Sequence, residues 1–308
     1  MVRHVGKPQF GVSTHLYHHQ RLCRDHLLEI AAYGFEMVEV FATRTHFDYH
    51  NPAAVADLQQ WLAEAGLVLQ SVHAPIAESY VGGRWSGTLS IASADPDARA
   101  HAVREAEQAL YIARRMPVPV LVTHLGLPRG QRADTEIGSS GAGSDPRVRP
   151  TGDTRAAAQR SVEDLQEIAG PLGVRIAVEV QPNELSRAGS LVHFVEEDVE
   201  RGGGPDGLDV GICLDFGHAH LDGDLVDAIE TVSEHLVATH VHDNRGRTDD
   251  HLMPFEGTID WPAALTAVQK IGYDGPFMLE IAAAGSTKDT LARAQQARQR
   301  MERLMIEG

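Results

Sequence analysis

The chain has few of the side chains that mark several common classes of protein. Two cysteines, Cys23 and Cys213, occur among 308 residues, which excludes a small scaffold held together by disulfides and predicts reduced, partly buried thiols. Three lysines occur, Lys7, Lys270 and Lys288, and none of them stands at the end of a predicted strand. A reaction that proceeds through a lysine Schiff base therefore has no obvious nucleophile.

Long apolar runs and an excess of positive charge are also absent. No uninterrupted apolar stretch is long enough to span a membrane, and residues 1–10 (MVRHVGKPQF) lack the apolar core of a signal peptide. We therefore expect a cytoplasmic protein without a membrane partner. The formal net charge of −16 disfavours nucleic acid as a partner, because a polyanion binds best to a basic surface.

What the chain does contain is a regular alternation of predicted strands and helices. Apolar, β-branched segments predict strands at 10–13, 37–41, 67–72, 118–123, 174–180, 210–214, from 236 onward, and at 277–279. Capping residues and amphipathic patterns predict helices at 24–33, 52–65, 96–115, 154–169, 191–200, 225–234, 261–271 and 287–304. This alternation predicts an α/β protein, a single (β/α)8 TIM barrel over residues 1–308 with a long loop insertion at about 125–153.

The alternative is an open, doubly wound sheet. That fold would place a glycine-rich phosphate loop after its first strand, where this chain has Ser13, Thr14 and His15. The closed barrel is therefore favoured.

Six consecutive predicted strands carry a metal-binding side chain near the carboxyl end. These residues are His73, His124, Glu179, Asp215, His240 and Glu280. In a barrel the carboxyl ends of the strands meet at one mouth, so we expect the six side chains to gather there. Buried and hydrogen-bonded polar residues are the simpler interpretation, but several carboxylates without a cation would repel one another. Imidazole and carboxylate are also the ligands that zinc and related metals prefer.

Further histidines and acids lie just beyond these strand ends. His218 follows Asp215 by one helical turn, and Asp249 and His251 lie in the loop after the seventh strand. His242 shares the strand face of His240, because side chains alternate along a strand. It either contacts a substrate or begins a polar loop.

The motifs at these positions resemble the xylose-isomerase-like barrel superfamily. They are HAP at 73, THLG at 123, VEV at 178, CLDFGHAH at 213, THVHDN at 239, DDH at 249 and LEI at 279. That superfamily contains sugar and sugar-phosphate isomerases and epimerases, and also endonuclease IV. The chain departs from its pattern at Pro254-Phe255-Glu256-Gly257, where the family usually has Gly-Glu-Gly.

The resemblance implies metal ligands. In the isomerases and epimerases one divalent metal is held by residues similar to Glu179, Asp215, His240 and Glu280. In endonuclease IV three zinc ions are held by nine residues, and the matching positions here add His73, His124, His218, Asp249 and His251. We therefore expect one to three divalent ions, with zinc, manganese, cobalt or magnesium as candidates.

Two enzymatic functions follow from these ligands. The favoured one is a metal-dependent isomerase or epimerase of a small sugar or sugar phosphate, which moves a proton through a metal-bound enediolate. Glu179 and Glu280 would exchange the proton, and His218 would hold a substrate oxygen. The alternative is a di- or trinuclear zinc phosphoesterase that cleaves a small phosphodiester or, less favoured, DNA.

A barrel that only binds a ligand is a third interpretation, and the ring of metal-binding residues argues against it. A carbohydrate is the expected partner. Since relatives often pair, a homodimer is also expected.

Overall fold

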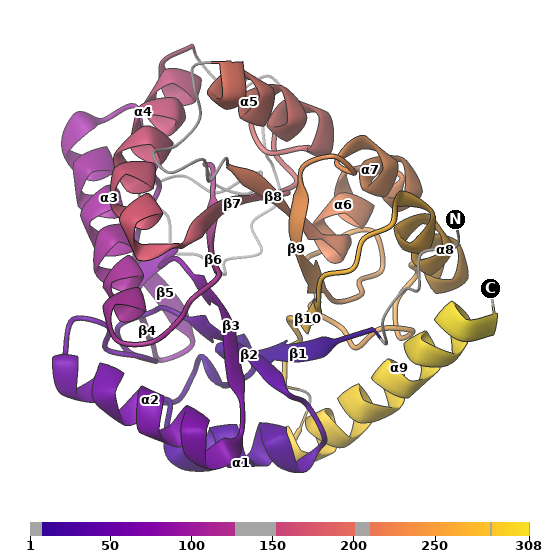
Figure 1. Ribbon diagram of the computed structural model, residues 1–308. Coiled ribbons are helices and arrows are strands. Elements are labelled where there is room, and N and C mark those ends of the chain that lie inside the picture. Colours follow the sequence, from indigo (N-terminus) through magenta and orange to yellow (C-terminus); the bar gives the residue numbers. More distant parts are fainter. Residues whose placement is uncertain (1–7, 127–151, 201–209, 284, 308) are drawn as a thin grey trace.

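A closed parallel barrel surrounded by helices forms the protein (Figure 1). The computed structural model describes residues 8–126, 152–200, 210–283 and 285–307. Its strands are β1 Phe10–Ser13, β2 Met37–Phe41, β3 Val68–His73, β4 Ala77–Val81, β5 Arg84–Thr88, β6 Val120–His124, β7 Arg175–Glu179, β8 Gly211–Asp215, β9 Leu236–Val241 and β10 Phe277–Leu279. Its α-helices are α1 Arg24–Ala32, α2 Pro52–Ala65, α3 Pro96–Leu110, α4 Gly152–Ala169, α5 Ala188–Glu200, α6 Phe216–Asp222, α7 Leu225–Thr231, α8 Trp261–Ile271 and α9 Thr287–Glu307. Short 3-10 turns lie at Thr14–Tyr17, Tyr111–Arg114 and Gly170–Leu172.

The barrel closes where its first and last strands meet. Neighbouring strands run in the order β1-β10-β9-β8-β7-β6-β3-β2, and every pair is parallel. Closure comes from the pairing of β1 with both β2 and β10. The predicted fold class is therefore confirmed, and the open sheet is excluded. Most of the insertion expected at about 125–153 lies outside the described residues.

Alternation along the strands separates two apolar layers. Val120 and Val122 of β6, Ala177 of β7 and Cys213 of β8 form a small cluster of buried residues. Their strand neighbours, such as Leu121 and Val178, belong to the larger cluster in which the helices also take part. The side chains two residues further along the inner rows of β6, β7 and β8 are therefore directed toward the barrel mouth.

The last helix, α9, makes hydrogen bonds to the C-terminal end of α1. Helix α9 lies beside α1 and α8 in Figure 1. Gln295 donates a hydrogen bond to the Tyr33 carbonyl, and the Arg298 guanidinium donates to the Gly34 carbonyl. These bonds satisfy carbonyls at the C-terminal end of α1, which would otherwise lack partners.

A β-hairpin and a helix were not predicted from the sequence. Residues 75–94, expected as a loop, contain the antiparallel hairpin β4–β5, whose turn is Gly82-Gly83 with φ angles of +60° and +81°. Two glycines between short strands are the signal for such a tight turn. The other element is α6, which starts directly after β8 because Asp215 accepts a hydrogen bond from the His218 amide as its N-cap.

The cysteines and the helices agree with part of the sequence analysis. Cys23 is half-buried, Cys213 is buried, and both are free thiols. None of the helices in the described ranges combines the length and the apolar character needed to cross a bilayer.

Candidate metal centre

Barrel geometry brings the six strand-end residues to one mouth. His73, His124, Glu179 and Asp215 are the last residues of β3, β6, β7 and β8. His124, Glu179 and Asp215 each stand two residues after the inward-facing Val122, Ala177 and Cys213, so they continue the inner rows of their strands. His240 is the last but one residue of β9, and Glu280 directly follows β10.

Glu179 lies at the centre of this group. Its Oε2 is 3.2 Å from Nε2 of His73, Nε2 of His124 and Nδ1 of His240. Its Oε1 is 3.2 Å from Nδ1 of His218 and accepts a 2.6 Å hydrogen bond from Gln181. The carboxylate is fully buried, and of its partners only His124 is partly exposed.

His240 joins Glu179 to the other carboxylates of the mouth. Its Nδ1 is 3.2 Å from Oε2 of both Glu179 and Glu280, yet it makes no hydrogen bond. Its Nε2 is 3.0 Å from Oε2 of Glu39, which also accepts a 2.8 Å hydrogen bond from the Ser71 hydroxyl. Glu39 therefore fixes the imidazole with its second nitrogen toward the two carboxylates.

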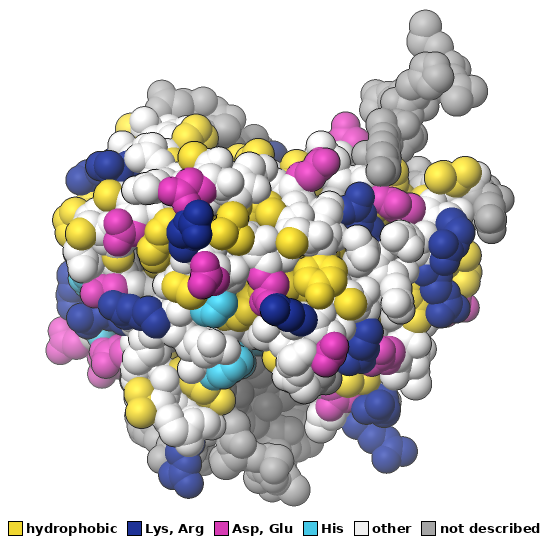
Figure 2. All heavy atoms as spheres, turned by 90° about the horizontal axis from the view of Figure 1, so that it is seen from below, with side chains coloured by type: hydrophobic (Ala, Val, Ile, Leu, Met, Phe, Trp, Pro, Cys, Tyr) yellow, Lys and Arg dark blue, Asp and Glu magenta, His cyan; other side chains and the backbone are white. Residues whose placement is uncertain are grey.

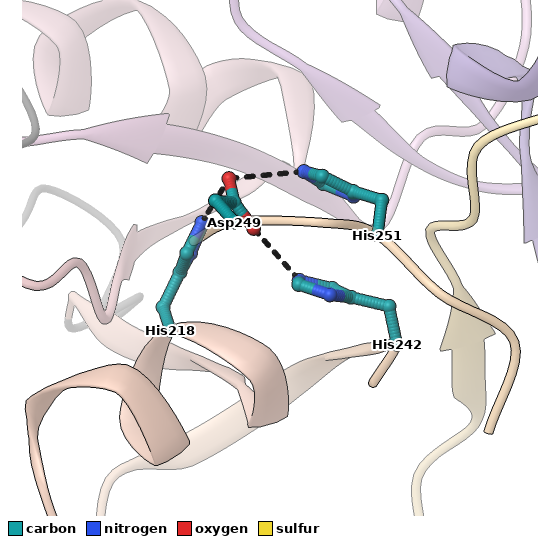
Figure 3. A group of neighbouring side chains, drawn as sticks. All are labelled: His218, His242, Asp249 and His251. Atoms are coloured by element: carbon teal, nitrogen blue, oxygen red, sulfur yellow. Dashed lines mark hydrogen bonds and ion pairs between the residues drawn. The ribbon is translucent and has the colours of Figure 1, made fainter. Parts of the chain in front are cut away.

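A second cluster, drawn in Figure 3, contacts the first through His218 and His242. Asp249 Oδ2 is 3.1 Å from Nε2 of His218 and 3.2 Å from Nε2 of His251. Nε2 of His242 lies 3.8 Å from Asp249 Oδ1 and 3.0 Å from Asp215 Oδ1. Asp215 and His218 thus contact residues of both clusters. We call the first cluster the inner cluster (Glu179, Asp215, His240, Glu280) and the second the outer cluster (His218, His242, Asp249, His251).

Carboxylates and imidazoles shift one another's pKa values within the two clusters. Burial tends to raise the pKa of Glu179, but His124 and His240 hold that pKa well below its usual value. Burial lowers the pKa of His251, whereas Asp249 raises it more strongly, and the resulting pKa is about 10. The pKa of His218 is also raised, since Asp215 and Asp249 outweigh its burial. A cation that binds here would replace such protons.

The donor set fits a divalent metal. The ligand atoms of the inner cluster lie within 4.8 Å of one another, as do those of the outer cluster. Nδ1 of His240 is a buried nitrogen with no hydrogen bond, although two carboxylate oxygens lie close to it, and a shared cation would satisfy all three atoms. Cys213 also approaches Glu179 and His240, but burial raises the pKa of its thiol to about 12, so it is a poor ligand at neutral pH.

All nine residues expected to bind metal lie in or beside these clusters. His73 and His124 join Glu179 in a further group, and the others belong to the inner or outer cluster. Their role as ligands stays a prediction.

Two residues of the site were missed, and the surroundings of a third were not predicted. Glu39 could have been noticed as an acid inside the apolar strand MVEVF. Gln181, whose amide nitrogen also lies 3.0 Å from His124 and 3.1 Å from His218, gave no signal. His242 was recognised, but its side chain is fully buried against Asp215 and is not exposed to a substrate.

A buried carboxylate organises the loop that carries Asp249 and His251. Asp243 accepts hydrogen bonds from the amides of Asn244, Phe255 and Ile259 and from the Trp261 indole. Phe255, which stands where the family pattern has a glycine, adopts a φ of +77°. Bulky residues rarely adopt this left-handed conformation. The hydrogen bond of its amide to Asp243 and the Arg300 guanidinium 4.0 Å above its ring hold it there.

Comparison with known proteins gives a family and a fold. The family described as "Xylose isomerase-like TIM barrel" matches residues 27–305. The matches to curated relatives cover less than half of each relative's own length. One of these relatives is Inosose isomerase of Bacillus licheniformis, 28% identical over 142 residues, which are 42% of this chain and 48% of the relative.

Two solved structures show the same fold. A D-tagatose 3-epimerase-like protein has a TM-score of 0.75 at 22% identity, over 97% of this chain and 98% of its own. The IOLI protein with a binding zinc atom has a TM-score of 0.71 at 17% identity, over 97% and 98%.

Proposed function

Because this chain belongs to the xylose isomerase-like TIM barrel family, we propose that it is a divalent-metal-dependent isomerase or epimerase of a small sugar or sugar phosphate. The inosose isomerase and the D-tagatose 3-epimerase-like protein support a polyhydroxylated carbonyl compound as the substrate class. The IOLI protein with its zinc atom supports a metal in this fold. Free thiols suit the cytoplasm, where we expect the enzyme to act, and a homodimer stays an expectation.

The observation that carries this proposal is the pair of carboxylates around His240. Glu179 and Glu280 come from β7 and from the end of β10, which are separated in the barrel by β8 and β9, and each places an Oε2 3.2 Å from the same nitrogen. Glu179, Asp215, His240 and Glu280 would hold the metal. A bound divalent cation would act as a Lewis acid on the carbonyl and hydroxyl oxygens of the sugar, which makes the neighbouring C–H acidic.

The residues of the chain would then move the proton. Glu179 and Glu280 converge from different strands. One carboxylate oxygen can therefore accept a proton from the substrate carbon, and the other carboxyl group can donate a proton back. His218, 3.2 Å from Glu179 Oε1, would hold that carboxylate in place, and its contact with a substrate oxygen stays a prediction. Trp85 of the hairpin and Phe41 lie with ring centroids 5.8 Å apart, and Phe41 in turn lies 5.2 Å from His73. These rings supply an apolar wall that would exclude water.

Solvent-deuterium exchange tests the proposal. Metal-stripped protein, refilled in turn with zinc, manganese, cobalt or magnesium, is incubated in D2O with ketoses, aldoses, inososes and their phosphates. We expect NMR to detect a carbon-bound deuterium in the product of one substrate class, because proton transfer exchanges with solvent. Glu179→Gln and Glu280→Gln should each lower the rate about 100-fold or more. Glu167→Gln, an exposed glutamate of α4, is the matched control. Folded, metal-loaded protein that exchanges no deuterium into any of these sugars would contradict the proposal.

A phosphoesterase with several zinc ions is the second candidate, and the outer cluster favours it. Two adjoining ligand groups could hold two or three ions, and many enzymes that hydrolyse phosphate esters use such multinuclear sites. DNA is the less favoured substrate, because the net charge is −16. On the face that Figure 2 shows, basic and acidic side chains of the described residues are also interspersed rather than segregated. Hydrolysis of a small aryl phosphodiester by the zinc-loaded protein, without deuterium exchange into sugars, would favour this candidate.

A further inference from the structure

The outer cluster contains one more imidazole than the sequence analysis assigned to metal binding. Asp249 lies between three rings, with Nε2 of His218 at 3.1 Å, Nε2 of His251 at 3.2 Å and Nε2 of His242 at 3.8 Å (Figure 3). In a tetrahedral zinc site with bonds of about 2.0–2.1 Å, neighbouring ligand atoms are roughly 3.3 Å apart. The distances around Asp249 are on this scale.

The second nitrogen of each ring faces an acceptor. Nδ1 of His251 donates to the Glu280 carbonyl at 2.8 Å, and Nδ1 of His242 lies 3.4 Å from the Asp243 carbonyl. Nδ1 of His218 lies 3.2 Å from Glu179 Oε1. With the proton on Nδ1, the lone pair of each Nε2 faces Asp249, which is the arrangement that metal-binding histidines usually show.

Close packing against His251 and Gly217 fixes the position of the His242 side chain. Its side chain is fully buried, and its ring stacks on His251 with centroids 4.1 Å apart. The second residue of α6 is Gly217, and a Cβ added there would come within 2.0 Å of His242 Cε1. Any other residue at 217 would therefore push the imidazole out of place.

Asp215 is the second carboxylate that contacts the His242 imidazole. Its carboxylate oxygens lie 3.0 and 3.1 Å from His242 Nε2, and Asp249 Oδ1 lies 3.8 Å from the same nitrogen. A metal ion held by His242 and Asp249 would lie where carboxylate oxygens already approach Nε2, and it would leave Asp215 to the inner cluster.

We propose that His242 is the fourth protein ligand of a closed metal site, made of His218, His242, Asp249 and His251, that retains zinc more firmly than the inner cluster. Four protein ligands complete a tetrahedral zinc ion, whereas catalytic zinc keeps a position open for water or substrate. The outer ion would thus hold the loop 243–251 against α6 and do no chemistry itself. This inference rests on the proposed function only for the presence of metal at the mouth.

Zinc retention tests the inference. Zinc-loaded protein is dialysed against EDTA, and the remaining metal is measured by elemental analysis. We expect about one zinc ion per chain to stay in the wild type, and His242→Asn and Gly217→Ala to lower retention at least 10-fold. His220→Asn is the matched control, since His220 lies on the same helix and contacts Thr258 instead. Circular dichroism verifies that each variant is folded.

Cobalt substitution gives a second measurement that needs no variant. The first equivalent of cobalt added to metal-free wild type should produce the strong visible absorption of a four-coordinate ion. Weak absorption from a five- or six-coordinate ion, or equal zinc retention in folded His242→Asn and wild type, would overturn the inference. Sugar exchange can fail while zinc is retained, and the reverse also holds, so the two proposals fail separately.

Discussion

At the scale of single residues, the inner cluster depends on a buried acid that orients an imidazole. Glu39 and Ser71 lie on β2 and β3, and Glu39 reaches His240, 201 residues further along the chain. A carboxylate that accepts the proton of one imidazole nitrogen strengthens the other nitrogen as a ligand. Glu39 thereby sets the direction in which His240 can bind metal.

The variant Glu39→Gln tests this role. The amide is neutral and keeps the size of the side chain, so we expect the affinity for the inner metal to fall about 10- to 100-fold while the fold is retained. Isothermal titration of metal-free protein measures the affinity. Ser71→Ala is the control, because it removes only one hydrogen bond from Glu39 and should have a smaller effect. Unchanged metal affinity in Glu39→Gln would show that Glu39 does not orient the ligand.

At the scale of elements, the loop between β9 and α8 is held by one carboxylate. Asp243 accepts bonds from three backbone amides and from the Trp261 indole, which lies at the start of α8. Gly257 belongs to the same arrangement, since a Cβ there would lie 2.2 Å from the Asn244 carbonyl and from Asp243. The loop can therefore present Asp249 and His251 to the outer cluster only while the Asp243 carboxylate is in place.

Asp243→Ala should destabilise this loop strongly. Four donors would lose their acceptor, and buried unsatisfied donors cost about 1–3 kcal/mol each, so a loss of at least about 3 kcal/mol in the free energy of unfolding is expected. Urea unfolding followed by circular dichroism measures it. Asp250→Ala is the matched control in the same loop, because Asp250 accepts a bond only from the Thr248 hydroxyl in the interactions that we describe. Equal stability of the two variants would contradict the central role of Asp243.

At the scale of the whole molecule, the parts that could be predicted from the sequence are those that depend on local pattern. The barrel follows from alternating strands and helices, and the mouth residues follow from their place at strand ends, as with His73 and Glu179. The roles of Glu39, Gln181 and His242 could not be predicted in this way. Their roles depend on which side chain faces them across the barrel, and that is decided by closure and register between distant strands.

The same closure makes metal binding a property of the folded chain. Glu179, Asp215, His240 and Glu280 are far apart in the sequence and gather only when the barrel is formed. A ligand that binds the folded but not the unfolded chain stabilises the fold, by about 2.7 kcal/mol at a free concentration 100 times Kd. We therefore expect the Tm of metal-stripped protein to rise by several degrees when zinc or manganese is restored.

Scanning calorimetry of metal-stripped and metal-refilled protein measures this increment in Tm. Two variants show which cluster holds the stabilising ion. Glu179→Gln removes the carboxylate that contacts His73, His124 and His240, so the inner cluster should lose its share of the increment and only the share of the outer cluster should remain. Glu167 is exposed on α4, so the Glu167→Gln variant should keep the full increment in Tm. If restored metal left the Tm of the wild type unchanged, the two clusters of the folded chain would bind the cation no more tightly than the unfolded chain does. An equal increment in Glu179→Gln would instead place the stabilising ion outside the inner cluster, because that cluster cannot keep its affinity without its central carboxylate.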